Sequence, residues 1–225
     1  MVRRNVAEAV TLPECAVGRL TPSATFSLAI NCIYEHNTIM AVETEDQSYL
    51  RRLEAENYRN LAIVHWTHAM KDRKKGWLTA EFHQRFRELL LHAGGKYAAW
   101  CPAYCLMPDH FHLIWMGISE GTDQKLATQW LRREVNRELR QADAILQRQA
   151  YDRILRNSER DQFAFEKLIG YVMDNPLRAG LVEESADWPF RGSILPGYPS
   201  VFRSAGDEDY WERFWKVYYS VIRQT

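Results

Sequence analysis

Two histidines placed two residues apart are the most informative feature of this chain. His110 and His112 lie in the segment Met107-Pro-Asp-His-Phe-His-Leu-Ile114, which otherwise has the pattern of a β-strand. Because successive side chains of a strand point to opposite faces, we expect both imidazoles on one face, with Phe111 and Leu113 on the other. Two neighbouring imidazoles form half of a metal site. Such a pair is also found as packed or surface histidines, so the spacing alone is consistent with both interpretations.

A tyrosine and an asparagine further along the chain complete a possible reaction site. Tyr171 lies near the end of a predicted helix, and Asn175 follows one turn later, close to the same helical face. Two imidazoles and an amide oxygen would bind a divalent cation incompletely and leave positions open for phosphate oxygens. The phenol of Tyr171 could then attack the phosphate and form a covalent phosphotyrosine. Taken separately, Tyr171 could be a packed aromatic residue and Asn175 a helix-terminal residue before proline.

The expected elements around these residues have the order of a split βαβ fold. The expected strands cover about Leu61–Thr67, Tyr97–Met107, His110–Met116 and Tyr151–Leu155. The expected helices run from Thr79 to Gly94-Gly95, from about Gln124 to Gln149, from about Gln162 to Asn175-Pro176, and along the C-terminal stripe that contains Trp211 and Phe214. This order predicts an α+β fold, a ferredoxin-like antiparallel sheet with helices on one face. RNA-recognition modules share the order, but the sequence lacks their glycine-rich aromatic strand.

Composition indicates an ordinary globular protein without a net charge that would attract nucleic acid. The chain has 225 residues, of which 46% are hydrophobic, and Lys+Arg and Asp+Glu number 29 each. Contacts with DNA or RNA must therefore come from local basic patches. The four cysteines lack zinc-ribbon spacing and are typical of buried thiols in a reducing compartment. Because we find neither a signal peptide nor a membrane-spanning run, we expect a soluble, cytoplasmic protein without membrane contact.

Two segments together resemble the HUH single-strand DNA transposases. The first, Tyr104-Cys-Leu-Met-Pro-Asp-His-Phe-His-Leu-Ile-Trp115, is similar to their metal-binding signature. The second, Gly170-Tyr-Val-Met-Asp-Asn-Pro-Leu-Arg-Ala-Gly-Leu-Val182, is similar to the nucleophile helix of the REP-associated tyrosine transposase branch. The segment Asp187-Trp-Pro-Phe-Arg-Gly-Ser193 is similar to the part that follows in that branch. The resemblance covers about residues 60–200.

The resemblance implies an HUH-endonuclease fold and an enzyme that cleaves and rejoins single-stranded DNA in transposition. Such enzymes recognise a hairpin of a repetitive extragenic palindrome, cleave beside it and retain the 5′ end on a tyrosine. It implies Tyr171 as the nucleophile, and His110, His112 and Asn175 as ligands of a divalent metal, Mg²⁺ or Mn²⁺. The expected partner is therefore single-stranded DNA with a hairpin, bound by a monomer or homodimer.

Two groups of arginines are the expected DNA contacts. The first group falls in segments that the family shares: Arg153, Arg156 and Arg178. The second group forms a basic face on the long predicted helix: Arg133, Arg137 and Arg140. That second face is consistent either with DNA-backbone contact or with a solvated helix surface stabilised by ion pairs.

We expect three parts along the chain and keep two alternative functions open. The parts are an N-terminal extension of unassigned structure over residues 1–57, the catalytic domain over 58–200, and a C-terminal helix packing on the core over 201–225. A non-catalytic protein that binds hairpin DNA or RNA would not need His110, His112 and Tyr171 together. A relaxase or replication initiator usually places its tyrosine differently and carries further domains. A covalent adduct with hairpin DNA would separate the enzymes from the binding protein.

Overall fold

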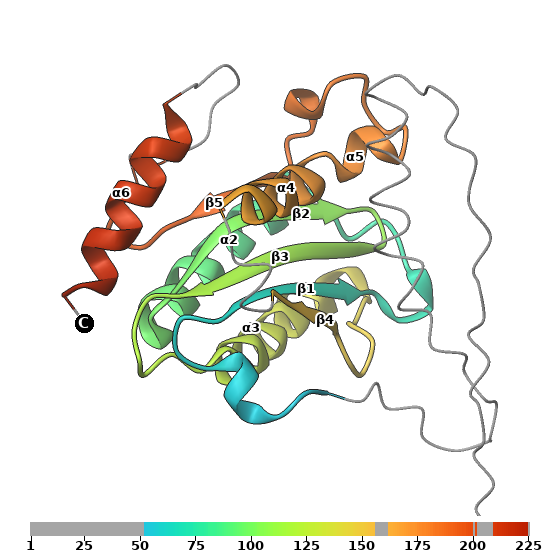
Figure 1. Cartoon of the computed structure of the whole chain (residues 1–225). Helices are drawn as coiled ribbons and strands as arrows, with labels where there is room; N and C mark the ends of the chain where they lie inside the picture. The colour runs from blue at the N-terminus through green and yellow to red at the C-terminus, as the bar shows by residue number, and fades with distance from the viewer. Residues whose placement is uncertain (1–51, 156–161, 200, 202–208, 225) are drawn as a thin grey trace, which may run out of the picture. The chain divides into compact units, whose positions relative to one another are not determined.

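The described part of the chain is organised by one five-stranded antiparallel sheet with helices packed on it (Figure 1). A computed structural model describes residues 52–155, 162–199, 201 and 209–224. The strands are β1 Ile63–Ala69, β2 Ala99–Met107, β3 His110–Gly117, β4 Tyr151–Ile154 and β5 Arg191–Ile194. Their spatial order is β4-β1-β3-β2-β5, so that β1, β3 and β2 lie in the interior of the sheet and β4 and β5 at its edges.

The first four strands and two helices confirm the predicted ferredoxin-like arrangement. The helix α2, Ala80–Tyr97, connects β1 to β2, and α3, Gln124–Leu139, connects β3 to β4. This βαββαβ order with strand order β4-β1-β3-β2 is the split βαβ topology. The strand β5 was not expected, and it extends the sheet beside β2.

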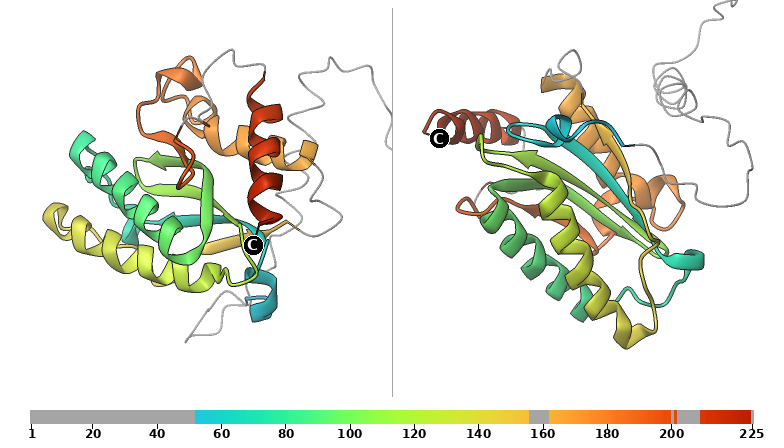
Figure 2. Two further views of the ribbon diagram at one scale, coloured as in Figure 1. Left: turned by 90° about the vertical axis from the view of Figure 1, so that its left-hand side faces the viewer. Right: turned by 90° about the horizontal axis from the view of Figure 1, so that it is seen from below.

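Helices lie on both faces of the sheet, so the expectation of helices on one face holds for α2 and α3 only (Figure 2). The face that carries Trp66 and Phe111 packs against α2 and α3. The opposite face, which carries Ile114 and Met116, packs against α4, Gln162–Met173, and α6, Tyr210–Ile222. Both faces of the central strands are therefore covered by apolar side chains along part of their length, as their buried pattern shows.

The helix α2 begins where the sequence predicts and ends later. The Thr79 hydroxyl accepts a hydrogen bond from the backbone N–H of Phe82 at 3.1 Å, which is a typical N-cap. The expected end at Gly94-Gly95 is wrong, because the helix continues to Tyr97. Gly94 serves close packing instead: a Cβ there would lie 2.6 Å from the carbonyl oxygen of Ala99.

The helix α3 is shorter than the sequence predicts. It starts at its N-cap Asp123, whose carboxylate accepts from the backbone N–H of Leu126 at 3.1 Å. The helix ends at Leu139 rather than near Gln149, and after a short 3₁₀ turn Asp143 adopts a left-handed conformation with φ 47°. The apolar period continues past this break because Leu146 still reaches the core.

Several expectations lie outside the described residues. Most of the expected N-terminal extension and Arg156 fall there, so the division into three parts stays a prediction. The helix α6 packs its aromatic stripe on the core, through Phe214 and Tyr218 among others. Of the four cysteines, Cys101 and Cys105 are described, and both are buried and free. No helix within the described ranges is long and apolar enough to cross a membrane.

Candidate active site

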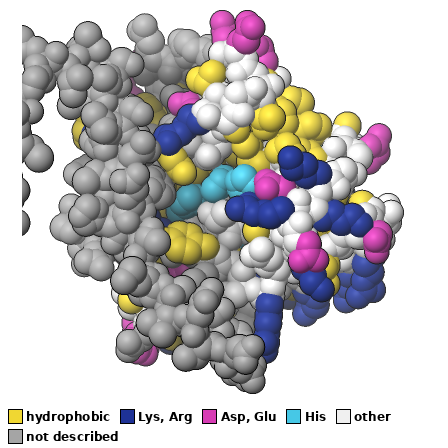
Figure 3. Space-filling model, turned by 90° about the vertical axis from the view of Figure 1, so that its right-hand side faces the viewer, with side chains coloured by type: hydrophobic (Ala, Val, Ile, Leu, Met, Phe, Trp, Pro, Cys, Tyr) yellow, Lys and Arg dark blue, Asp and Glu magenta, His cyan; other side chains and the backbone are white. Residues whose placement is uncertain are grey.

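Strand pairing brings polar side chains from separate parts of the sequence together at one end of the sheet. In the pairing of β1 with β3, Thr67 lies opposite His112 and Ala69 opposite His110. Side-chain alternation then places His65 and Thr67 of β1 on the same face as the two histidines of β3. This is the face on which α4 packs. Figure 3 shows histidine side chains reaching the surface of the molecule close to Lys and Arg side chains.

The carboxylate of Asp109 holds the imidazole of His110. The Nδ1 atom of His110 lies 2.6 Å from Oδ1 of Asp109, and Arg73 lies 3.3 Å from the other carboxylate oxygen. Partial burial raises the pKa of Asp109, but the hydrogen bond and charge of His110 and the charge of Arg73 outweigh it and lower the pKa below its usual value. A carboxylate that accepts from Nδ1–H leaves the Nε2 atom of His110 with its lone pair, as in metal-binding histidines.

His112 lies between two groups of polar atoms. Its Nδ1 lies 3.1 Å from Nε2 of His65 and 3.1 Å from the hydroxyl oxygen of Thr67. Its Nε2 lies 3.1 Å from Nε2 of His110. Burial, together with the neighbouring histidines, holds the pKa of His112 well below its usual value, and burial with the nearby Arg153 charge lowers the pKa of His65 to about 3. Both imidazoles are therefore neutral at pH 7, as metal ligation requires.

The positions of the two Nε2 atoms fit a shared divalent cation. Ligand nitrogens at about 2.1 Å from a metal and about 90° apart would lie about 3.0 Å from each other, close to the 3.1 Å between His110 and His112. Within the described ranges, no group of three His, Cys, Asp or Glu side chains could hold a metal ion. A third protein ligand would therefore come from another residue type, such as the amide of Asn175.

Tyr171 lies against the histidines at the end of α4. Its ring is edge-on to those of His65 and His112, with centroids 6.2 Å and 6.3 Å apart. The guanidinium of Arg178, on the short helix α5 (Asn175–Arg178), lies over the same ring with its Cζ 4.8 Å from the centroid. The Nδ2 of Asn175 donates to the backbone carbonyl of Tyr171 at 3.0 Å, which leaves the Oδ1 atom as the possible ligand.

Curated proteins similar to this chain bear one name. A protein of Haemophilus influenzae, provisionally named as a REP-associated tyrosine transposase, is 28% identical over 142 residues, which are 57% of this chain and 77% of that protein. The REP-associated tyrosine transposase of Escherichia coli K12 is 25% identical over 124 residues, 54% of this chain and 70% of that protein. The chain is thus similar to two REP-associated tyrosine transposases over more than half of its length. No protein-family model matches it.

A solved structure supports the relationship at the level of the fold. The structure of the REP-associated tyrosine transposase bound to a REP hairpin matches with a TM-score of 0.53 and 20% identity, covering 64% of this chain and 82% of that one. The mixed sheet with packed helices is therefore a fold that this chain shares with a REP-associated tyrosine transposase. The resemblance drawn from the two sequence segments is confirmed.

The arginines that were expected to contact DNA fall into two separate places. Arg153 on β4 lies opposite His65 in the strand pairing, on the face of the candidate site, and Arg178 covers Tyr171. The second group lies on the far layer, because α3 packs on the other face of the sheet. There the side chains of Arg133, Arg137 and Arg140 line a surface cavity of about 380 Å³. Glu134 forms ion pairs with two of them, Arg133 and Arg137.

Three residues of the site were not predicted from the sequence. His65 and Thr67 contact His112, and Asp109 contacts His110. The signal for the first two was present, since they occupy alternate positions of a strand whose other residues, apart from His68, are apolar. The sequence indicates Asp109 only as a residue of the turn before β3, although a carboxylate next to a ligand histidine is a common orienting group.

Proposed function

We propose that this protein is a metal-dependent single-strand DNA endonuclease and strand transferase that cleaves beside a hairpin through a covalent 5′-phosphotyrosine. The observation that carries the proposal is the position of the Tyr171 ring against His112, whose Nε2 lies 3.1 Å from that of His110. The names of the relatives and the hairpin bound in the similar structure support hairpin DNA as the substrate.

In this proposal each side chain of the site has a separate task. His110, His112 and the amide oxygen of Asn175 would hold Mg²⁺ or Mn²⁺, and the carboxylate of Asp109 orients the first imidazole. The cation, when bound, would supply positive charge to the oxygens of the scissile phosphate. The ring of Tyr171 lies edge-on to the rings of His65 and His112, which places the tyrosine beside this position.

The reaction balances as an exchange of one phosphodiester for another. The hydroxyl oxygen of Tyr171 forms a bond to phosphorus, and the bond between phosphorus and the 3′ oxygen breaks. The phenol proton is lost to solvent, and the leaving 3′ oxygen takes up a proton and becomes a free hydroxyl. The 5′ phosphate stays on the tyrosine, so a second 3′ hydroxyl can attack the linkage and rejoin the strands. Arg178, which covers the ring, and Arg153 would supply charge for the flanking phosphates.

The proposal is tested by trapping the covalent intermediate. Single-stranded DNA with a hairpin of a repetitive extragenic palindrome and flanking sequence is labelled at either end and incubated with the protein and Mn²⁺. We expect a denaturant-stable adduct that carries the 3′ label only, because the 5′ end of the cleaved strand stays on the protein.

The control variant is Tyr171→Phe, which removes one hydroxyl. It should lose the adduct and keep hairpin binding. Adduct formation by this variant, or in excess EDTA, would refute the proposed nucleophile or the proposed metal role. Tight hairpin binding by the wild-type protein without any adduct would instead favour the non-catalytic binding protein.

A further inference from the structure

A row of paired residues crosses the whole sheet through the candidate site. In the strand pairing, Tyr151 of β4 lies opposite Thr67, Thr67 opposite His112, His112 opposite Cys105, and Cys105 opposite Arg191. Directly paired residues point to the same face of a sheet, so Tyr151 shares the face of His112. Neighbouring strands are about 4.8 Å apart, which places the backbone of Tyr151 about 10 Å from that of His112.

Tyr151 differs from other described tyrosines because its side chain has no partner among the residues that the structure describes. Its exposed fraction is 40%, and none of the described residues gives it a hydrogen bond or a ring contact. By contrast, the hydroxyl of Tyr58 donates to Asp152 at 2.5 Å, and that of Tyr104 lies 2.9 Å from Nε2 of His83. Within the described part of the chain, ring packing and hydrogen bonding therefore do not account for an aromatic ring at this position.

The surroundings of Tyr151 favour a nucleic-acid ligand. Arg153, two residues along β4, points to the same face and lies opposite His65, close enough for its charge to affect the pKa of that histidine. An exposed aromatic ring beside a cationic side chain is the arrangement with which proteins bind single strands, since the ring stacks on a base and the cation contacts phosphate. An apolar protein partner would be a poor fit for a single ring beside an arginine.

We propose that Tyr151 is a stacking platform for a base of the single-stranded DNA that flanks the cleaved bond. The inference rests on the proposed function, because the site of cleavage defines where the strand runs. A stacked strand rises about 3.4 Å per nucleotide, so a span of about 10 Å corresponds to a base within about three nucleotides of the scissile phosphate. Tyr151 would thus position the strand without taking part in the chemistry.

Binding measurements in a cleavage-deficient protein test this role. In the Tyr171→Phe background, the affinity for single-stranded hairpin DNA is measured for the further changes Tyr151→Ala and Tyr151→Phe. Loss of one base–aromatic stack should weaken binding about 5- to 150-fold for Tyr151→Ala. Tyr151→Phe should bind like the parent, because a phenyl ring also stacks. Thermal unfolding of each variant verifies that the fold is retained.

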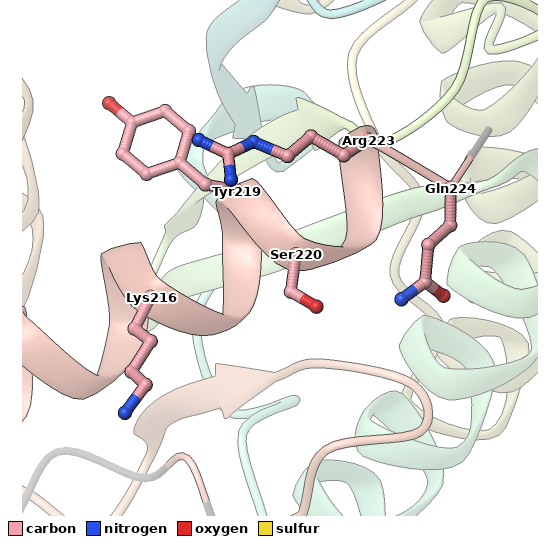
Figure 4. A pocket seen from close by; sticks show the side chains of 5 residues that line it. All are labelled: Lys216, Tyr219, Ser220, Arg223 and Gln224. Carbon is pink, nitrogen blue, oxygen red and sulfur yellow. The ribbon is translucent and has the colours of Figure 1, made fainter.

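A series of abasic substitutions identifies the stacked base. One abasic position, within about three nucleotides of the cleavage site, should weaken binding by the parent and leave binding by Tyr151→Ala unchanged. Tyr219→Ala is the matched control: this tyrosine is also 40% exposed, but it lies on α6 beside a separate surface cavity (Figure 4). Its variant should bind DNA like the parent.

The possible outcomes separate this inference from the proposed function. The stacking role alone would be refuted if Tyr151→Ala bound DNA as tightly as the parent. It would also be refuted if the loss of affinity caused by Tyr151→Ala added fully to the loss caused by every abasic substitution. Absence of hairpin binding by the parent protein itself would refute the proposed function together with it.

Discussion

Three buried neutral histidines should make the folded protein sensitive to mild acid. His65, His68 and His112 have exposed fractions of 2%, 0% and 7%. Burial lowers the pKa of each below the ordinary value of 6.5, with the nearby charges of Arg153 on His65 and Arg132 on His68 acting in the same direction. In addition, the guanidinium of Arg132 lies 2.9 Å from Nδ1 of His68, and an imidazole accepts such a hydrogen bond only when that nitrogen is unprotonated.

The sign and size of the effect follow from proton linkage. In the unfolded chain these histidines take up protons below about pH 6.5, whereas in the folded protein they stay neutral, so the free energy of unfolding decreases as the pH falls. Between pH 7 and pH 5.5 each histidine should lower it by about 1.2 kcal/mol, and the three together by about 4 kcal/mol. His83, whose pKa burial and the charge of Arg87 also lower, adds in the same direction. For a domain of ordinary stability, about 5–15 kcal/mol, this is a substantial part of the total.

Urea unfolding in EDTA at pH 7.0, 6.0 and 5.5, followed by tryptophan fluorescence, measures the decrease. The matched variant is His68→Asn, because an asparagine oxygen can still accept from Arg132 but does not titrate. Its pH dependence should be smaller than that of the wild type by about one third, whatever its absolute stability. An unfolding free energy that is the same at pH 7.0 and 5.5, or an unchanged pH dependence in the variant, would refute the assignment of neutral buried histidines.

Three further predictions concern the metal, the packing and the DNA. Asp109→Asn should raise the Mn²⁺ concentration needed for adduct formation about 10- to 100-fold, because it removes the carboxylate that orients the ligand His110. The control Arg73→Ala should change that concentration little, because the ion pair between Arg73 and Asp109 is exposed. Gly117→Ala should lower the melting temperature measurably, since its Cβ would overlap the backbone carbonyl of Asn60; an unchanged melting curve would contradict this packing. Arg153→Ala should reduce the slope of log affinity against log salt by just under one, and an unchanged slope would show that Arg153 does not contact a phosphate.

The sequence predicts those site residues that lie close to each other within one strand or one helix. His110 and His112 belong to one strand after a Pro-Asp turn, and Tyr171 and Asn175 to one helix end, so short-range periodicity places each pair on one face. His65 and Thr67 reach His112 through the pairing of two strands whose residues are more than forty positions apart. That pairing depends on the topology of the sheet, which an alternating pattern within one strand does not specify.

The same limit explains the errors in the fold. The helix expected to reach Gln149 keeps its apolar period beyond Leu139, and the break at Asp143 depends on a left-handed backbone conformation that periodicity does not reveal. In the sequence, the pair Gly94-Gly95 indicates the end of a helix. Gly94 is instead required by the close approach of the backbone around Ala99, a contact between segments that only the tertiary fold defines.

The face of the sheet that carries the candidate site is divided along the length of its strands. At the start of β3, His110 and His112 are polar and lie by the end of α4, whereas Ile114 and Met116 further along the same face belong to the apolar core. Strand alternation cannot separate these two groups, because all four side chains point the same way. The two groups are separated by their position along the strand. The start of β3 can therefore carry the polar site, while the rest of the same face packs in the apolar core.

The C-terminal helix α6 contributes to the position of Tyr171 through its packing on α4. Near the start of α4, Phe165 packs on Phe214 and Trp215 of α6, with ring centroids 5.7 Å and 5.0 Å apart. Tyr171 lies later on the same helix, with its ring edge-on to that of His65. Because an α-helix is a stiff element, fixing its first turns against α6 restricts where the Tyr171 ring can lie over the histidines. The aromatic stripe of α6 thus packs in the core, and by packing on α4 it also helps to fix the position of Tyr171.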